Sequence, residues 1–382
     1  MVKVVMRPTL AWLRVLLAWM VLDLHYGFYR DLVAPHIVAL LGPLAWLNDG
    51  AIAVFGFFIL SGYLVADMLE RRYPLRGVGD FGHFLLGRIA RIYPLYWLVL
   101  GAWLILRPQP LPAPGALLAN ILLFPYGLWS FFMDQQQTGP LFSYLVLVPA
   151  WTLALDLVFY PIGAVLVAGR RWLPLWLGIG FALVLIAACQ APAGVGKLAY
   201  DAWHFRFWTT AGPNLLAFLL GLTMRLWGKA LPRPPWAVFT ALLALVYVAY
   251  LPWGLGYYGA TLLSLAALLW LVHHLAGAGR GPYEALLGNA TYAVYLVHVP
   301  VLLLLWAHWG GGWPVRISAV LLSGALALFL AVAVEGPLEH LRHKWLRAPF
   351  YAGSGKVRWE RWALGLSALW ACSAFAYLAF GW

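Results

Sequence analysis

The sequence predicts an all-α fold, a polytopic helical bundle embedded in a membrane, from three observations. Hydrophobic residues make up 64% of the 382 residues, charged residues only 10%, and the mean hydropathy is +0.82, which is far more apolar than a soluble globular protein. The apolar residues form runs of about 20, the length of helix that crosses a bilayer. The 25 Lys and Arg residues stand in short clusters between these runs. Cytoplasmic loops have this pattern, so we expect no nucleic-acid partner.

Apolar windows predict about 10–11 transmembrane helices. In chain order the windows cover residues 9–29, 50–69, 90–107, 145–168, 173–190, 212–228, 235–252, 258–276, 284–307, 315–335 and 362–381. A further apolar segment, 115–132, is interrupted by Pro125 and Gly127.

Charge decides whether segment 115–132 crosses the membrane. If it does not cross and the N-terminus is cytoplasmic, 19 of the 25 basic residues face the cytoplasm, and Arg14 lies inside the first span. The five that face outside are Arg30, Arg107, Lys197, Arg206 and Arg316. A crossing at 115–132 would invert every later loop and destroy this bias. We therefore predict a re-entrant or interfacial element on the outer side.

The chain is expected to divide into one large membrane domain and two short C-terminal parts. Residues 1–340 would form the transmembrane domain, 341–361 a basic cytoplasmic connection held at anionic membrane lipid, and 362–382 an additional C-terminal transmembrane helix. Cys189 and Cys372 fall inside apolar runs with no His or carboxylate at metal-ligand spacing. Neither a disulfide nor a metal site is expected.

The first span carries two ionisable residues, Arg14 and His25. Eleven helical steps return to within about 20° of the starting direction and rise about 16 Å, so both lie on one stripe. Ionisable groups in a membrane span usually face a protein interior or a water-filled cavity, which favours a functional role. Alternatively, each side chain reaches its nearest headgroup region and is merely tolerated there.

A pair of arginines, Arg88 and Arg91, lies at the predicted cytoplasmic end of the third span. Residues three apart are neighbours on a helix, and two adjacent guanidinium groups can each bind phosphate oxygens in a bidentate manner. The pair therefore favours a phosphate-bearing ligand. Two ordinary positive-inside arginines are the alternative.

Six segments in order along the chain carry a family resemblance. They are Arg14 with ten residues before His25; Phe57-Phe58-Ile59-Leu60-Ser61-Gly62-Tyr63-Leu64; Phe84 through Trp97; Trp151-Thr152-Leu153-Ala154-Leu155-Asp156-Leu157-Val158-Phe159-Tyr160; Leu287-Gly288-Asn289 with Thr291-Tyr292 and Tyr295-Leu296-Val297-His298; and Glu335-Gly336-Pro337. The ordered set resembles the acyltransferase 3 family of integral-membrane acyltransferases that modify bacterial glycans.

The sequence departs from this family's pattern at two positions. Phe55 stands where the family has an acidic residue in the second helix, and Asp156 stands where members often have Glu. A fused extracytoplasmic esterase-like domain, which some members have, is not expected here. The chain would then complete the transfer itself or hand the acyl group to a separate extracytoplasmic acyl-accepting protein.

The resemblance implies an O-acyltransferase in the cell's cytoplasmic membrane, with acyl-CoA, most simply acetyl-CoA, as the donor substrate. The acceptor would be a hydroxyl of an extracytoplasmic glycan or glycolipid. Arg88 and Arg91 would bind the phosphates of coenzyme A, and Tyr93 is assigned to the same site. Arg14 would contact the pantetheine arm or stabilise the oxyanion.

A transfer to an alcohol needs a base, and we assign that role to His25. Asp156, expected in the outer half of its span, would orient the imidazole, as an acid does in a catalytic triad. His298, in the later histidine motif, is either a further catalytic residue or a structural one.

The outer loop 191–211 contains His204 and Arg206, which we assign with Trp151 to the acceptor site. Aromatic residues also gather at any membrane interface, so this assignment has an alternative. Two other functions stay open. One is a transporter or flippase without covalent chemistry, although no inverted repeat is apparent. The other is acyl transfer to a small cytoplasmic alcohol such as a macrolide.

Overall fold

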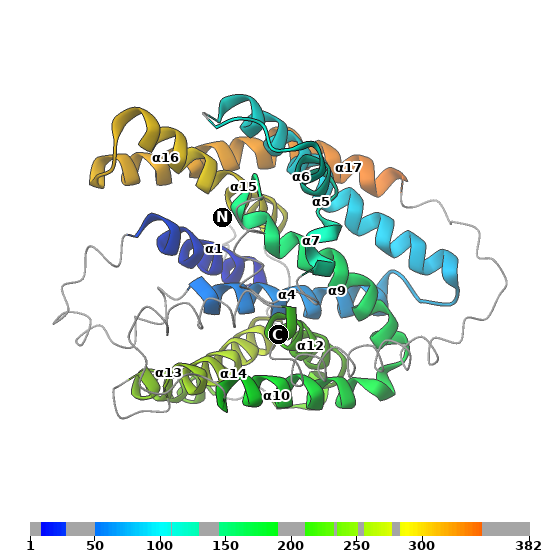
Figure 1. The fold of residues 1–382 in the computed structure, drawn as a ribbon. Coiled ribbons are helices and arrows are strands. Elements are labelled where there is room, and N and C mark those ends of the chain that lie inside the picture. The colour runs from blue at the N-terminus through cyan, green and yellow to red at the C-terminus, as the bar shows by residue number, and fades with distance from the viewer. Residues whose placement is uncertain are drawn as a thin grey trace, which may run out of the picture. The chain divides into compact units, whose positions relative to one another are not determined.

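The computed structural model describes residues 9–27, 50–107, 109–129, 145–189, 211–232, 235–250, 256–276 and 283–345 (Figure 1). These residues form helices and contain no strand, which confirms the predicted all-α class. The window 362–381 and the predicted acceptor residues His204 and Arg206 lie outside the described residues.

The helices follow the predicted windows closely. They are α1 (Leu10–Tyr26), α4 (Gly50–Arg71), α5 (Val78–Leu106), α6 (Pro114–Leu122), α7 (Phe124–Trp129), α9 (Trp151–Ala168), α10 (Leu173–Cys189), α12 (Ala211–Trp227), α13 (Trp236–Tyr250), α14 (Gly256–Ala276), α15 (Glu284–Trp309), α16 (Trp313–Leu330) and α17 (Gly336–Trp345). Short 3₁₀ turns lie at Val148–Ala150, Arg170–Trp172 and Gly228–Ala230, and a π-helical segment, Ala331–Glu335, joins α16 to α17.

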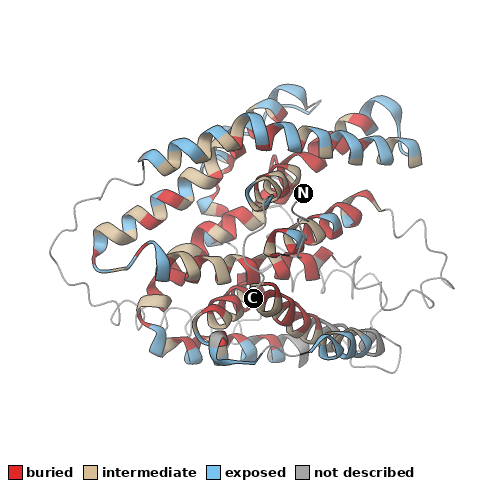
Figure 2. Cartoon of the chain, turned by 180° about the vertical axis from the view of Figure 1, so that it is seen from behind, coloured by how far each residue is buried: buried red, intermediate tan, exposed pale blue. Residues whose placement is uncertain are grey.

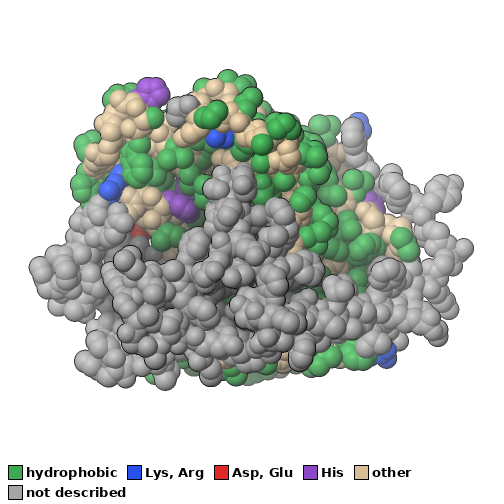
Figure 3. All heavy atoms as spheres, in the orientation of Figure 1, with side chains coloured by type: hydrophobic (Ala, Val, Ile, Leu, Met, Phe, Trp, Pro, Cys, Tyr) green, Lys and Arg blue, Asp and Glu red, His purple; other side chains and the backbone are tan. Residues whose placement is uncertain are grey.

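Five described helices are long and apolar enough to cross a membrane. They are Ile52–Arg71, Val78–Leu106, Val148–Ala168, Glu284–Trp309 and Trp313–Lys344. Large apolar side chains are exposed along them, for example Ile105 at 84%, Leu321 at 68% and Phe329 at 62%. On the face that Figure 3 draws, hydrophobic side chains cover much of the surface of the described residues. Such a surface suits lipid and not water.

The chain forms two compact units. Unit 1 contains residues 1–57, 98–108 and 228–341, and unit 2 contains residues 58–97, 109–227 and 342–382. In unit 1, α1 packs against α14 and α15, α15 against α16, and α13 against α14. In unit 2, α9 packs against α7 and α12, and α10 against α12. Buried side chains follow these contacting faces (Figure 2).

Helix α5 begins twelve residues before the predicted window 90–107. Residues 78–89 are too polar for a hydropathy window, yet the helix runs unbroken through them and through Pro94 for 29 residues. Such a helix is about 43 Å long, against a hydrocarbon core of about 30 Å. The paired arginines Arg88 and Arg91 therefore lie within one continuous helix.

The described part of the segment predicted to be interrupted, residues 115–129, forms α6 and α7 with a break between them. The break falls at Leu123, whose φ of 57° is left-handed, and not at Pro125, which lies in the first turn of α7 where a missing N–H costs little. The fully buried Asn120 accepts a hydrogen bond from the Val146 N–H, and its own carbonyl accepts one from the Tyr96 hydroxyl. Protein contacts thus satisfy the backbone near this break, as such an element requires in a membrane.

Two glycines set the distance between α4 and α12 in unit 2. A Cβ on Gly62 would collide with the Phe218 carbonyl, and one on Gly221 would collide with the Ile59 carbonyl. Small residues allow this close helix contact in membrane proteins. Gly62 follows Ser61 directly, so the crossing also fixes the position of the Ser61 side chain.

Candidate active site

The polar stripe of α1 faces α15 in unit 1. Arg14 Nη1 lies 3.0 Å from where a Cβ on Gly288 would stand, and His25 contacts His298. Since Arg14 precedes His25 and Gly288 precedes His298, α1 and α15 run in the same direction. The predicted topology also has these two helices running in the same direction, from the inside to the outside. They would run in opposite directions if segment 115–132 crossed the membrane.

His25 and His298 form a directly contacting pair. His298 Nε2 lies 3.3 Å from His25 Nδ1, and the ring centroids are 5.0 Å apart in an edge-to-face arrangement. His25 Nδ1 also lies 2.8 Å from the Val21 carbonyl oxygen, and His298 Nδ1 lies 3.0 Å from the Val294 carbonyl oxygen. His298 is fully buried, whereas His25 is partly exposed.

These contacts determine where the imidazole protons lie. A carbonyl oxygen only accepts, so Nδ1 of each ring must carry a hydrogen. In a neutral His298, Nε2 then holds a lone pair and accepts from His25 Nδ1–H, which is shared with Val21. His25 Nε2 is left with a lone pair and with no hydrogen-bond partner among the described residues. A base that takes a proton from an alcohol needs this state.

Tyr26 and Ser323 hold the histidine pair in position through hydrogen bonds. The buried Tyr26 hydroxyl donates to the His298 carbonyl at 3.0 Å and lies 2.9 Å from Ser323 Oγ on α16. This arrangement ties α1, α15 and α16 together at the depth of the pair. Neither residue was predicted, because a hydroxyl in an apolar run gives only a weak signal of its partner.

Unit 2 holds a second polar cluster, centred on Asp156 in α9. Ser61 Oγ on α4 donates to Asp156 Oδ1 at 2.8 Å, and the Tyr160 hydroxyl one turn along α9 is also hydrogen-bonded to this carboxylate. Arg88 on α5 lies within electrostatic range of Asp156 and Tyr160. Ser61 and Tyr160 stand in segments that the sequence singled out, but their contact with Asp156 was not predicted.

Arg88 is the eleventh residue of α5, which begins at Val78. In unit 2 it lies within electrostatic range of Asp156. The expected depths of Asp156 and Arg88 in the membrane stay predictions. The predicted pairing of Asp156 with His25 involves two different units and stays a prediction.

The remaining predicted site residues have the following positions. Arg91 is partly buried on α5, three residues after Arg88. The Tyr93 hydroxyl donates to the Leu122 carbonyl at the end of α6, which gives this side chain a structural contact. Trp151 is the first residue of α9 and is partly buried.

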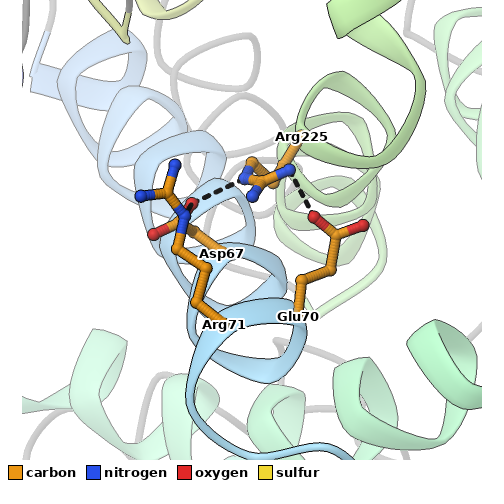
Figure 4. Close-up of polar contacts among 4 residues, drawn as sticks. All are labelled: Asp67, Glu70, Arg71 and Arg225. Atoms are coloured by element: carbon orange, nitrogen blue, oxygen red, sulfur yellow. Dashed lines mark hydrogen bonds and ion pairs between the residues drawn. The ribbon is translucent and has the colours of Figure 1, made fainter.

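An ion-pair cluster joins α4 and α12 near their ends (Figure 4). Arg225, only 3% exposed, lies 2.7 Å from Asp67 Oδ1 through its Nε and pairs with Glu70 through Nη1. The exposed Arg71 also binds Asp67, at 2.8 Å. A lone arginine in an apolar run was counted only as a loop charge. The two carboxylates three residues apart on α4 were the signal that it would be paired.

Comparison with protein families matches residues 7–336 to an acyltransferase domain, that of the acyltransferase 3 family. This chain belongs to the acyltransferase 3 family. The exopolysaccharide production protein ExoZ of Rhizobium meliloti strain 1021 is 30% identical over 312 residues, which cover 76% of this acyltransferase and 89% of ExoZ. No solved structure matches the chain.

A protein of Staphylococcus aureus strain COL, described as a candidate O-acetyltransferase, is 22% identical over 335 residues. Its counterpart in strain N315 matches equally well. The match covers 80% of this acyltransferase but spans only 53% of these staphylococcal proteins, about half of their length. The family, the relatives and the apolar helices together make the chain a multi-pass membrane O-acyltransferase. Among the described residues of the acyltransferase, no group of three or more His, Cys, Asp or Glu side chains is placed to hold a metal ion.

Proposed function

We propose that this acyltransferase moves an acyl group, most simply acetyl, from acyl-CoA to a hydroxyl of an extracytoplasmic glycan or glycolipid in the cytoplasmic membrane. The histidine pair carries this proposal. The partly exposed imidazole of His25 contacts the buried imidazole of His298. An ionisable group in a membrane helix is costly and usually serves a function. His25 therefore offers the base that acyl transfer needs. The relatives named for exopolysaccharide production and O-acetyl transfer support the glycan acceptor and the acetyl group.

The chemical step follows from the lone pair on His25 Nε2. This nitrogen takes the proton of the acceptor hydroxyl while the oxygen attacks the thioester carbonyl and forms the new carbon–oxygen bond. The tetrahedral intermediate then breaks its carbon–sulfur bond, and the imidazolium returns the proton to the departing thiolate of coenzyme A. His25 Nδ1–H keeps its hydrogen bonds throughout, so the ring stays oriented.

Arg14 was given two alternative roles, and its position supports one of them. Its guanidinium lies over Gly288, ten residues before His298 along α15. Ten helical steps correspond to about 15 Å. A group at that distance from the base does not touch the same reacting carbonyl, whereas the long pantetheine arm of the donor can extend past both. We therefore assign Arg14 to donor binding.

Release of the coenzyme A thiol tests the function. The purified full-length protein in nanodiscs, given acetyl-CoA and an envelope glycan fraction, should release free thiol and add an acetyl mass to the glycan. His25→Ala should lower the rate by about 100-fold or more. His308→Ala is the matched control, since His308 lies exposed on α15, where its ring contacts the Leu304 carbonyl and the neighbouring Trp309.

Two results would contradict the proposal at different points. Substrate movement across the bilayer without thiol release would indicate a transporter. A correctly inserted His25→Ala variant that works at the wild-type rate would reject His25 as the base and leave the overall reaction standing.

A further inference from the structure

Helix α17 brings a third arginine onto the paired-arginine segment of α5. Arg342 Nη1 donates to the Ala90 carbonyl at 3.1 Å, and Ala90 lies between Arg88 and Arg91 in the sequence. Next to Arg342, His343 Nδ1 lies 3.2 Å from Arg72 Nη2. In unit 2, α17 therefore contacts both the paired-arginine segment of α5 and Arg72, the residue that follows α4.

The electrostatics of this cluster favour an anionic ligand. Arg88 lies within electrostatic range of both Arg91 and Arg342, and like charges held close together in a partly desolvated place repel. Asp156 offsets part of the charge on Arg88. The buried Nε of Arg88 has no hydrogen-bond partner among the described residues. A ligand with several phosphate oxygens would offset the repulsion and satisfy such donors.

We propose that Arg342 is the third guanidinium of the site that binds the phosphates of the acyl donor, together with Arg88 and Arg91. The inference rests on the proposed function and deepens it, because it concerns the same donor. Coenzyme A carries a 3′-phosphate and a pyrophosphate, and planar guanidinium groups bind such oxygens in pairs. The basic run after residue 340, expected to serve only as a connection at the membrane surface, would then contribute directly to donor binding.

Equilibrium binding of coenzyme A to the full-length protein in nanodiscs tests this role. Arg342→Gln should weaken binding by about 10- to 100-fold, the effect of losing a charged hydrogen-bonding partner. Arg342→Lys keeps the charge and should lose less. Lys344→Gln, an exposed position on the same helix, should bind like the wild type.

A phosphate-free donor shows whether Arg342→Gln is simply misfolded. Acetyl-pantetheine lacks every phosphate, so the variant should use it at the wild-type rate if only the phosphate contact is lost. Equal losses with acetyl-CoA and acetyl-pantetheine would overturn the proposal, as would wild-type affinity of Arg342→Gln for coenzyme A. Failure of the wild-type protein itself to bind coenzyme A would instead reject the donor in the proposed function.

An anionic lipid headgroup offers the same phosphate chemistry, so binding is measured in two bilayers. In neutral phosphatidylcholine nanodiscs the effect of Arg342→Gln on coenzyme A should persist. If the variant loses only its preference for phosphatidylglycerol and binds coenzyme A normally, Arg342 serves the membrane surface, and the proposal is wrong.

Discussion

Removing the acceptor nitrogen of His298 should slow the acyltransferase without abolishing it. His25 Nδ1–H has two acceptors, the Val21 carbonyl and His298 Nε2, so His298→Leu leaves the tautomer held by one of them. The variant mainly loses stabilisation of the His25 imidazolium that forms during transfer, because the hydrogen bond from this imidazolium to His298 is charge-assisted. Such a bond is worth roughly 1.5–3 kcal/mol, which corresponds to a fall in kcat of about 10- to 100-fold.

The assay is thiol release from acetyl-CoA, with kcat and KM determined separately. His298→Gln should recover part of the lost rate, because its amide oxygen can accept from His25, and KM should change little in either variant. Combining His298→Leu with His25→Ala gives a double-mutant cycle. If His298 acts through His25, the double variant should be no slower than His25→Ala alone.

Additive losses in that cycle would refute the reasoning, because they would mean that His298 supports the fold or the site independently of His25. Equal activities of the Leu and Gln variants would refute it as well. Thermal unfolding of each purified variant shows whether lost folding explains a lost rate.

Three further predictions concern packing and charge. Gly221→Ala should lower the unfolding temperature measurably, because the added Cβ would collide with the backbone of α4. Gly101→Ala, where a Cβ would have nothing within 4 Å, should be neutral or stabilising. Equal unfolding temperatures of the two variants would contradict the close crossing of α4 and α12. Arg225→Leu should destabilise the protein by about 3 kcal/mol, because it removes the buried guanidinium that pairs with Glu70 and shares Asp67 with the exposed Arg71. A denaturation midpoint equal to wild type would argue against the ion-pair cluster. Gly288→Leu should displace the Arg14 guanidinium and reduce acyl transfer at unchanged stability, while Gly288→Ala needs a shift of only a few tenths of an ångström; wild-type transfer by the Leu variant would reject the Arg14 assignment.

The helices could be predicted from the sequence because lipid leaves few alternatives. Every backbone polar group in a bilayer must be satisfied locally, so an apolar run of sufficient length becomes a helix. Window 284–307 accordingly appears as α15, Glu284–Trp309, and window 50–69 as α4, Gly50–Arg71. The same reasoning failed at the start of α5. Hydropathy detects the apolar stretch of a helix that suits lipid. It does not detect the polar residues by which a helix such as α5 extends beyond that stretch.

The candidate site was predictable as far as helical geometry reaches. The spacing of Arg14 and His25 placed them on one stripe, and both do contact α15. Their partners depend on which helices pack together, and one sequence does not show that. His298 was therefore selected without a partner, and Arg342 was read only as part of a charge run because its contact lies 252 residues away, at Ala90.

A buried histidine has one advantage over a carboxylate as the group that orients a base in a membrane. A carboxylate in low dielectric costs several kcal/mol unless it is paired, and it must stay ionised while the base is neutral. His298 accepts the same Nδ1–H bond without any charge in the resting state. A charge appears only on the imidazolium of His25, which is partly exposed. The carboxylate of Asp156, by contrast, lies beside the hydroxyls of Ser61 and Tyr160 and within range of Arg88, groups that can stabilise an ionised form. We therefore expect His298 to orient the base and Asp156 to act beside Arg88 in donor binding. Asp156→Asn should then raise the KM for acetyl-CoA more than it lowers kcat. The opposite pattern would return Asp156 to the role of orienting the base.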